Sequence, residues 1–389
     1  MSNCDPLLAR VKQIGGIIES TCGEGGSFIS ADFGLRISSL NAAVSMAPIE
    51  DDTLSATLSP RKLAMGEKTI QVQVAGKLVG SGVAATKPEH DVYLRACGYA
   101  SVVAQSAAIG AVTGGPFAAG ETITQATSLA TGMVVRTCIN GDAKLYFTVL
   151  SGTFNGTDVI TGSSSGATAT PSAVPAAAGY AYHPVTNSQE TAAFRIEEDG
   201  KYKLCYGAMG NFTINAESSG PATIEYTLNG KFSGHGDANL TSGVTPFTTA
   251  YPTLLDARAY MDAGLSTEFL PVVRSVAFDN QGQAVVRKDA NDTTGLIAAQ
   301  VTGRTPQITL TAESSLNADY DVLEKMADSD SVSIGFGFNA PDNKVYIFGV
   351  NGQITDAPEG DADGFMTNDL QFRMNGVNGD DELWIAFLV

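Results

Sequence analysis

Histidine and cysteine are the side chains here that could bind a metal or carry acid–base chemistry. The histidines are His90, His183 and His235. They stand in three unrelated sequence contexts, which favours solvated or structural roles over a shared metal. The five cysteines are scattered without a C-x-x-C pair: Cys4, Cys22, Cys97, Cys138 and Cys205. This spacing favours neither a zinc site nor a disulfide framework, and it suits a reducing compartment. We expect no metal and no cofactor.

Two glycine-containing stretches resemble ligand loops only superficially. The acidic run "EGDADGFMTND" would need an oxygen ligand at its fifth position counted from Asp361, where Phe365 stands. The stretch "GFGFNA" lies in a strand-like run and does not open a helix, so it is no dinucleotide fingerprint. The motifs G-x-x-x-x-G-K-[ST] and H-E-x-x-H are absent from the sequence. We therefore expect that the protein is not an enzyme.

Composition points to a β-rich protein that avoids nucleic acid phosphates. The 389 residues include 42 glycines and 43% hydrophobic residues, enough for a large core with many turns. The net charge of −18 disfavours binding to DNA through its backbone. The start of the chain has no hydrophobic signal core, and the uncharged stretch 96–120 contains Gln105 and Pro116. We expect no membrane insertion.

The strands and turns that would position any site occur twice in the chain. Setting Gly207 over Gly349 places "KLCYG" on "VYIFG", without gaps, and Phe194 on Phe336. In both copies a hairpin turn lies between the strand-like run that contains the phenylalanine and the run that ends in the glycine. Farther on, "EYTLNGKF" resembles "QFRMNGVN". The spacing indicates that Gly207 and Gly349, with the runs that precede them, belong to a tandem repeat.

Upstream segments follow the same order in each copy. The runs "TIQVQVAG" and "PQITLTAES" alternate apolar and polar residues, which is typical of half-buried strands. After each comes a short helical signature, "KPEHDVYLRACG" in the first copy and "NADYDVLEKMAD" in the second, where we expect a cap at Asn317 or Asp319. Each copy thus reads strand, helix, strand, hairpin, strand.

The first copy carries an extra block rich in Ala, Gly, Ser and Thr with almost no charge, which predicts a small exposed β insertion. The predicted organisation is an N-terminal arm, a first β domain in two pieces, the insertion, a linker and a second β domain. Their ranges are 1–33 for the arm, 34–98 and 190–234 for the first domain, 99–189 for the insertion, 235–265 for the linker and 266–389 for the second domain.

These stretches together resemble the major tail tube proteins of long-tailed bacteriophages. The similarity is carried by "LLARVKQ…IESTCGEG", by "KTIQVQVAGKLVGSG…KPEHDVYLRACGYASVV" and by the segment from "YHPVTNSQETAAFRIEEDGKYKLCYGAMG" to "NGKFSG". The C-terminal half fits a second, more divergent copy. The resemblance covers most of the chain except the insertion, and no catalytic motif contributes to it.

The resemblance implies a mainly β fold: tandem β-sandwich or partial-barrel domains, each with a flanking helix, the first with an insertion. It implies a virion protein of the tail, assembled in the host bacterial cytoplasm, that stacks as rings around a lumen through which genomic DNA is ejected without specific binding. Its partners would be itself and other tail proteins at the tube ends. Since family rings present six domains, two per chain imply a homotrimer with pseudo-sixfold symmetry.

The charged segments before each core strand are the expected contacts between stacked rings. The first supplies Asp51, Asp52, Arg61 and Lys62, and the second supplies Arg287, Lys288 and Asp289. Long connections of this kind are usually functional or mobile. Three other functions stay open: a capsid decoration protein, a head-completion protein, or an adhesin whose insertion binds carbohydrate.

Overall fold

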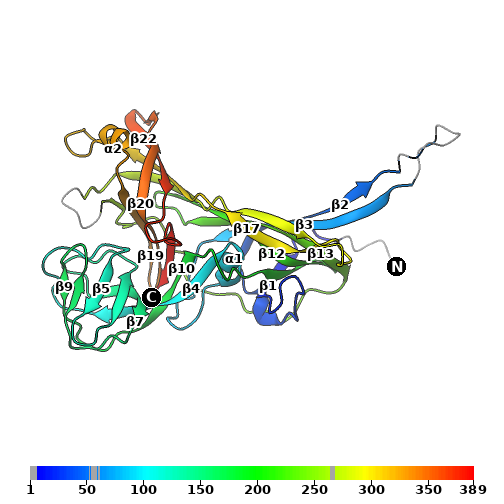
Figure 1. Ribbon diagram of the computed structural model, residues 1–389, viewed down its shortest axis with the longest axis horizontal. Helices are drawn as coiled ribbons and strands as arrows, with labels where there is room; N and C mark the ends of the chain where they lie inside the picture. The colour runs from blue at the N-terminus through cyan, green and yellow to red at the C-terminus, as the bar shows by residue number, and fades with distance from the viewer. Residues whose placement is uncertain (1–6, 52, 54–58, 60–61, 263–267) are drawn as a thin grey trace.

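The computed structural model describes residues 7–51, 53, 59, 62–262 and 268–389. It is an elongated, mainly antiparallel β structure with two short α-helices in the described part, which confirms the mainly β fold (Figure 1). A two-stranded projection extends from one end of the long axis, and the insertion lies at the opposite end. Neither α-helix in the described part is long and apolar enough to span a bilayer.

The first repeat is a six-stranded antiparallel sheet in the order β2-β3-β13-β12-β11-β1. Its strands are β1 (Lys12–Ile18), β2 (Ile37–Ile49), β3 (Ala64–Lys77), β11 (Ala192–Glu198), β12 (Lys201–Glu217) and β13 (Thr223–Asp237). A 3₁₀ helix, η1 (Ser30–Phe33), follows β1, and helix α1 (Asp91–Ala96) follows β3.

The second repeat has the same order, β15-β18-β22-β20-β19-β14, also antiparallel. Its strands are β14 (Tyr260–Met261), β15 (Val273–Asp279), β18 (Gln307–Glu313), β19 (Val332–Ala340), β20 (Asn343–Asp356) and β22 (Phe365–Met374). Helix α2 (Val322–Asp328) stands in the place of α1, and β21 (Glu359–Ala362) extends the hairpin to β22. Two more strands, β16 (Gln283–Lys288) and β17 (Leu296–Gly303), form a separate hairpin.

Strand register agrees with the alignment of the two glycine patterns. Phe194 lies opposite Cys205, and Phe336 lies opposite Ile347 at the matching place in the second repeat. In the same way Phe212 lies opposite Tyr226, and Ile354 lies opposite Phe372. Because a one-residue slip would turn every side chain to the other face of the sheet, this match fixes both core faces.

The repeats differ where β13 corresponds to two strands. β13 runs unbroken alongside β12, whereas its counterpart is divided into β22 and β23 (Trp384–Leu388), both paired with β20. The break follows Asn375-Gly376, which aligns with the Asn229-Gly230 pair inside β13. The residues between, 375–383, form a loop over the second repeat.

One core joins the two repeats. Ile70, Val72 and Val74 alternate inward from β3, as Ile308 and Leu310 do from β18. Both sets belong to one continuous cluster that also holds large aromatic side chains from both repeats: Phe194, Phe212, Phe278, Phe336 and Phe338. Burial of this shared apolar surface provides most of the driving force that holds the repeats side by side.

The insertion has a core of its own. It is built from β5 (Thr122–Gln125), β6 (Thr131–Val134), β7 (Lys144–Ser151), β8 (Ile160–Gly162) and β9 (Thr168–Ala169), around Phe117, Phe147 and Phe154. Its stem is β4 (Tyr99–Ala108) paired with β10 (Ala176–Pro184). β10 also pairs with β23, so the block 99–189 includes strands of the main sheet.

Local features differ from the sequence expectations at three places. β1, within the range predicted as an arm, pairs with β11 over seven residues and closes the first sheet. β13 extends to Asp237 and β14 lies at Tyr260–Met261, both inside the range predicted as a linker. Asn317 and Asp319 do not cap α2: its N-cap is Asp321, whose side chain accepts a hydrogen bond from the Glu324 amide at 2.9 Å.

Candidate assembly site

The two repeats are joined laterally by backbone hydrogen bonding between β12 and β15. The register runs from Thr213 opposite Asp279 to Glu217 opposite Ser275. Beyond the ladder, the Asn280 amide donates to the Phe212 carbonyl over 3.1 Å. β15 lies on the side of β12 that β11 occupies farther back along the strand, because β13 takes the other side. The second repeat thus continues the sheet of the first.

After β15, the hairpin β16–β17 crosses the outer face of the first repeat. Met209, which points away from the main core, packs with Ala299 and Val301 of β17. Gly207 has a positive φ of 59°, and a Cβ there would lie 2.6 Å from the Ala298 Cβ. The close approach therefore requires glycine at this position.

The far end of the β16–β17 hairpin is bound to β3 and to β13 by ion pairs. Lys288 pairs with Glu67 at 2.5 Å, and Lys231 pairs with Asp292 at 2.7 Å. The hydrogen bond from Lys231, with those from Thr294, lowers the pKa of Asp292 to about 2. The Lys68 amide also donates to the Thr294 carbonyl.

Two strand edges are unpaired on one side in the described part of the chain. In the described part of the chain β2 pairs only with β3, and its carbonyls at Leu40 and Ala42 accept from the ammonium groups of Lys12 and Lys203 at 3.4 and 3.2 Å. These carbonyls point away from β3. Residues 353–356 of β20 pair with β22 on one side and with no described strand on the other. Unpaired edges are templates for another chain.

The outer half of the β2–β3 hairpin, residues 45–51 and 62–69, is here named the β2–β3 projection. It extends away from the body of the molecule (Figure 1). Four of its apolar side chains are well exposed: Met46 (40%), Ile49 (56%), Leu63 (43%) and Met65 (58%). Exposed apolar side chains concentrated on a projecting element mark an interaction surface.

The charged residues expected at ring contacts fall into two separate groups. Asp51 and Lys62 are exposed at the end of the β2–β3 projection, while Asp52 and Arg61 lie outside the described residues. The second group lies on the β16–β17 hairpin. There Lys288 reaches Glu67, Arg287 approaches the Cys22 sulfur at 3.9 Å, and Asp289 accepts from the amide of Asn291. The structure links the β16–β17 hairpin to β3 through the Lys288–Glu67 pair and through the hydrogen bond from the Lys68 amide to the Thr294 carbonyl.

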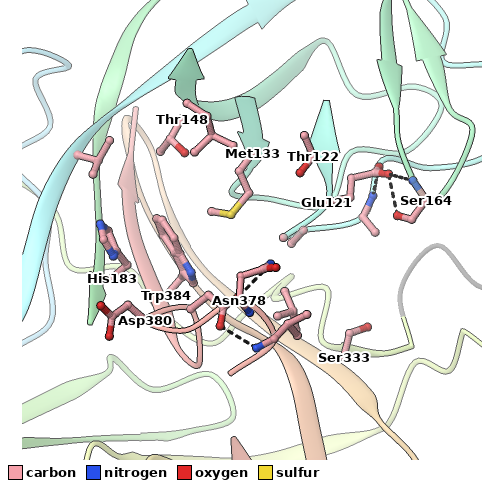
Figure 2. Close-up of a pocket in the computed structure, with 18 of the residues that line it drawn as sticks. Glu121, Thr122, Met133, Thr148, Ser164, His183, Ser333, Asn378, Asp380 and Trp384 are labelled. Atoms are coloured by element: carbon pink, nitrogen blue, oxygen red, sulfur yellow. Dashed lines mark hydrogen bonds between the residues drawn. The ribbon is translucent and has the colours of Figure 1, made fainter. Parts of the chain in front are cut away.

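A cleft of about 840 Å³ opens between the insertion and the outer face of β20, beside the place where Gly120 lies against Val350 (Figure 2). The insertion contributes Met133, Thr148 and Leu150 to its lining, and the second repeat contributes Val350, Val377 and Trp384. Trp384 stacks on His183 with ring centroids 4.6 Å apart. The cleft is therefore mainly apolar, with an aromatic wall.

Hydrogen-bonding capacity in the cleft is unevenly used. Glu121, 6% exposed, accepts from the Ala118 amide and from the amides and hydroxyls of Ser164 and Ser165, so it is satisfied. By contrast, the indole N–H of Trp384 and the hydroxyl of Thr148 are buried without a partner. A buried polar group without a partner is costly, but neither of these atoms is open to solvent, so they do not by themselves indicate a ligand.

The histidines and cysteines have structural surroundings. His90 is buried, with Nε2 at 2.9 Å from the Lys77 carbonyl and Nδ1 at 3.1 Å from the Tyr226 hydroxyl. Burial lowers the pKa of His90 to about 4 and raises the pKa of the adjacent Glu89 to about 7. Within the described residues, no group of three or more potential ligands could hold a metal. The four described cysteines are free.

No family model matches the chain, and no curated protein matches it.

Proposed function

We propose that this protein is a structural subunit of a bacteriophage tail tube, which assembles as stacked rings around a lumen for DNA ejection. One observation carries the proposal: the chain holds two copies of one strand order, joined side by side by the β12–β15 ladder. A ring-forming subunit needs a lateral contact that each copy can repeat, and this contact exists within the chain. The sequence resemblance to tail tube proteins supports the same function.

With six domains per ring, as the resemblance implies, repetition of the internal contact between chains would give a ring of three chains. β2 holds the place of β15, and β20 holds the place of β12. The 353–356 edge of one chain would therefore pair with β2 of the next. The alignment is specific: Ala42 corresponds to Asn280, and Ile354 corresponds to Phe212. The hydrogen bond between the Asn280 amide and the Phe212 carbonyl predicts one from Ala42 to Ile354 across chains. Head-to-tail contacts of this kind generate a closed ring when the rotation between successive subunits brings the last subunit back to the first.

The net charge suits a conduit for DNA. A basic channel would gain counterion-release free energy at each phosphate and retain the polymer, whereas an acidic wall repels it over a Debye length of roughly 8 Å at physiological salt. With 41 acidic against 23 basic residues, we propose a lumen lined by acidic and neutral polar side chains. Asp51 and Lys62 stay candidates for contacts between rings, because they end the projection.

Electron microscopy of the purified full-length chain tests the function. Hollow rods whose rings contain three chains, with pseudo-sixfold density, are the expected result. Rings with six full chains would contradict the pairing of the repeats. Monomers that never polymerise, but bind phage shells, would instead support a decoration protein, and monomers that bind glycans would support an adhesin.

A further inference from the structure

We propose that the β2–β3 projection of one chain packs its apolar side chains into the cleft between β20 and the insertion of the neighbouring chain. The inference rests on the proposed ring and names the receptor surface for the projection. Its partner is a second copy of this chain in the same ring, so the contact is lateral. The sequence had predicted a role between rings for this segment.

The precedent lies inside the chain. The β16–β17 hairpin stands between β15 and β18, as the outer part of the β2–β3 hairpin stands between β2 and β3. It covers the face of β12 that carries Met209, opposite the face that supplies Cys205 and Phe212 to the main core. One repeat's hairpin therefore already packs on the outer face of its neighbour's central strand.

The matching face of β20 is the floor of the cleft. Val345 and Ile347 point into the main core, whereas Phe348 and Val350 point the other way and pack near Trp384. Val350 and Trp384 line the cleft. In the first repeat the equivalent face is occupied by β17. In the second repeat the insertion covers part of this face, since Gly120 lies against Val350 and Ala119 shares an apolar cluster with Phe348, and the cleft is the part left open.

The two surfaces complement each other. The projection offers Met46, Leu63 and Met65, flexible or branched apolar side chains of the kind that fill irregular pockets. Lysine and arginine are absent from the cleft lining. The carboxylates there have partners, since Asp380 binds the Thr186 amide and Asp381 binds the Val377 amide. The occupant is thus expected to be apolar and uncharged at the contact.

Two polar groups beneath the cleft lining, the indole N–H of Trp384 and the hydroxyl of Thr148, lack partners but are buried, so the apolar side chains of the projection carry the contact. The register shift between Met46 and Pro48 marks the point where the projection departs from the regular ladder, as bulged strands bend at such positions.

Disulfide trapping tests the contact directly. In a Cys4→Ser/Cys22→Ser background, Met65→Cys with Val377→Cys should give cross-linked trimers on oxidation of assembled rings, because both sites are exposed in the monomer. The matched control pairs Met65→Cys with Leu316→Cys, an equally accessible site away from the cleft. Cross-linking of the control as fast as the test pair would overturn the proposal.

Trp384 supplies a second readout, because it is the chain's one tryptophan. Its fluorescence should shift as wild-type rings form. The Leu63→Ser/Met65→Ser variant should keep the monomer's unfolding midpoint, since both side chains are exposed, yet weaken ring formation by about tenfold or more. Normal wild-type tubes with unchanged Trp384 emission and no Met65–Val377 cross-link would refute this contact while leaving the tube function intact. A wild-type chain that forms no rings would overturn both.

Discussion

At the scale of single residues, the aligned glycines Gly207 and Gly349 serve different neighbours. Gly207 admits β17, whereas a Cβ on Gly349 would meet the methyl carbon of Met374 at 2.0 Å and the Glu382 carbonyl at 3.0 Å. Glycine is therefore required more strictly at 207, where backbone conformation and the Ala298 backbone both exclude a side chain, than at 349, where the end of the flexible Met374 side chain can move. A sequence reveals the shared glycine but not the two partners.

Gly207→Ala should destabilise the protein by about 1–3 kcal/mol, because the methyl group adds strain at positive φ and displaces Ala298. Urea unfolding of the monomer measures the loss. Gly110→Ala is a suitable control, since a Cβ there meets nothing within 4 Å. Equal stability of the Gly207 variant and wild type would show that the hairpin adjusts freely.

Buried His90 makes stability depend on pH. Its pKa falls from 6.5 in the unfolded chain to about 4 in the folded protein, so the unfolded state binds the proton more readily. The contribution of His90 to the free energy of unfolding should be fully present above pH 6.5 and should fall as pH decreases toward 4, by on the order of 3 kcal/mol. Arg36 pairs with Glu89, whose carboxylate lies 3.8 Å from the imidazole, and the Tyr226 hydroxyl contacts the other ring nitrogen.

Glu89 acts in the opposite direction, because its raised pKa makes stability fall as pH rises from 4.5 toward 7. His90→Gln isolates the histidine contribution. The stability difference between wild type and this variant should change in favour of wild type as pH rises from 4 to 7. Denaturant unfolding at several pH values measures it, and a pH-independent difference would contradict a neutral buried imidazole.

At the scale of elements, the order of strands, helix and hairpin along each copy and the alignment of the two copies could be predicted from alternation and glycine spacing, because both are local in sequence. The alignment of Phe194 with Phe336 holds in the strand pairing. The division of the last strand into β22 and β23, and the β12–β15 junction, could not be predicted. They depend on contacts between distant segments, which leave no periodic signal in one sequence. The cleft was missed for the same reason.

A proline pair tests the proposed β2 edge. The carbonyl of Ala42 points away from β3, and in an antiparallel pair the amide of the same residue points the same way. Ala42→Pro should therefore leave the β2–β3 ladder intact but abolish pairing with the next chain. Ala43→Pro, one residue on, should break the ladder and lower stability. Sedimentation measures assembly, and normal rings from the Ala42 variant would exclude this edge.

At the scale of the whole molecule, the insertion has its own core, is joined to the body by a paired stem, and shares a second apolar cluster with the second repeat, where Tyr146 packs with Tyr346 and Phe348. Ser106 lies opposite Ala176, so the ends of the insertion are already close. Replacing residues 109–175 with a short Gly-Ser bridge should leave a folded body, less stable because Tyr146 of β7 no longer packs against it or donates to the Val389 carbonyl. A cooperative unfolding transition followed by circular dichroism is the expected result, and its absence would show that the body depends on the insertion.

The insertion interrupts one repeat and spares the other, so the two halves of the chain are equivalent in the sheet but not on the surface. In a ring built from alternating repeats, every second position would carry a lobe and the positions between would be bare. The inner wall would then keep nearly uniform spacing for a polymer sliding past, while the outside would have vertical furrows. A neighbouring ring rotated by one position would place its lobes over those furrows, so the surface pattern of the tube would record how successive rings are turned.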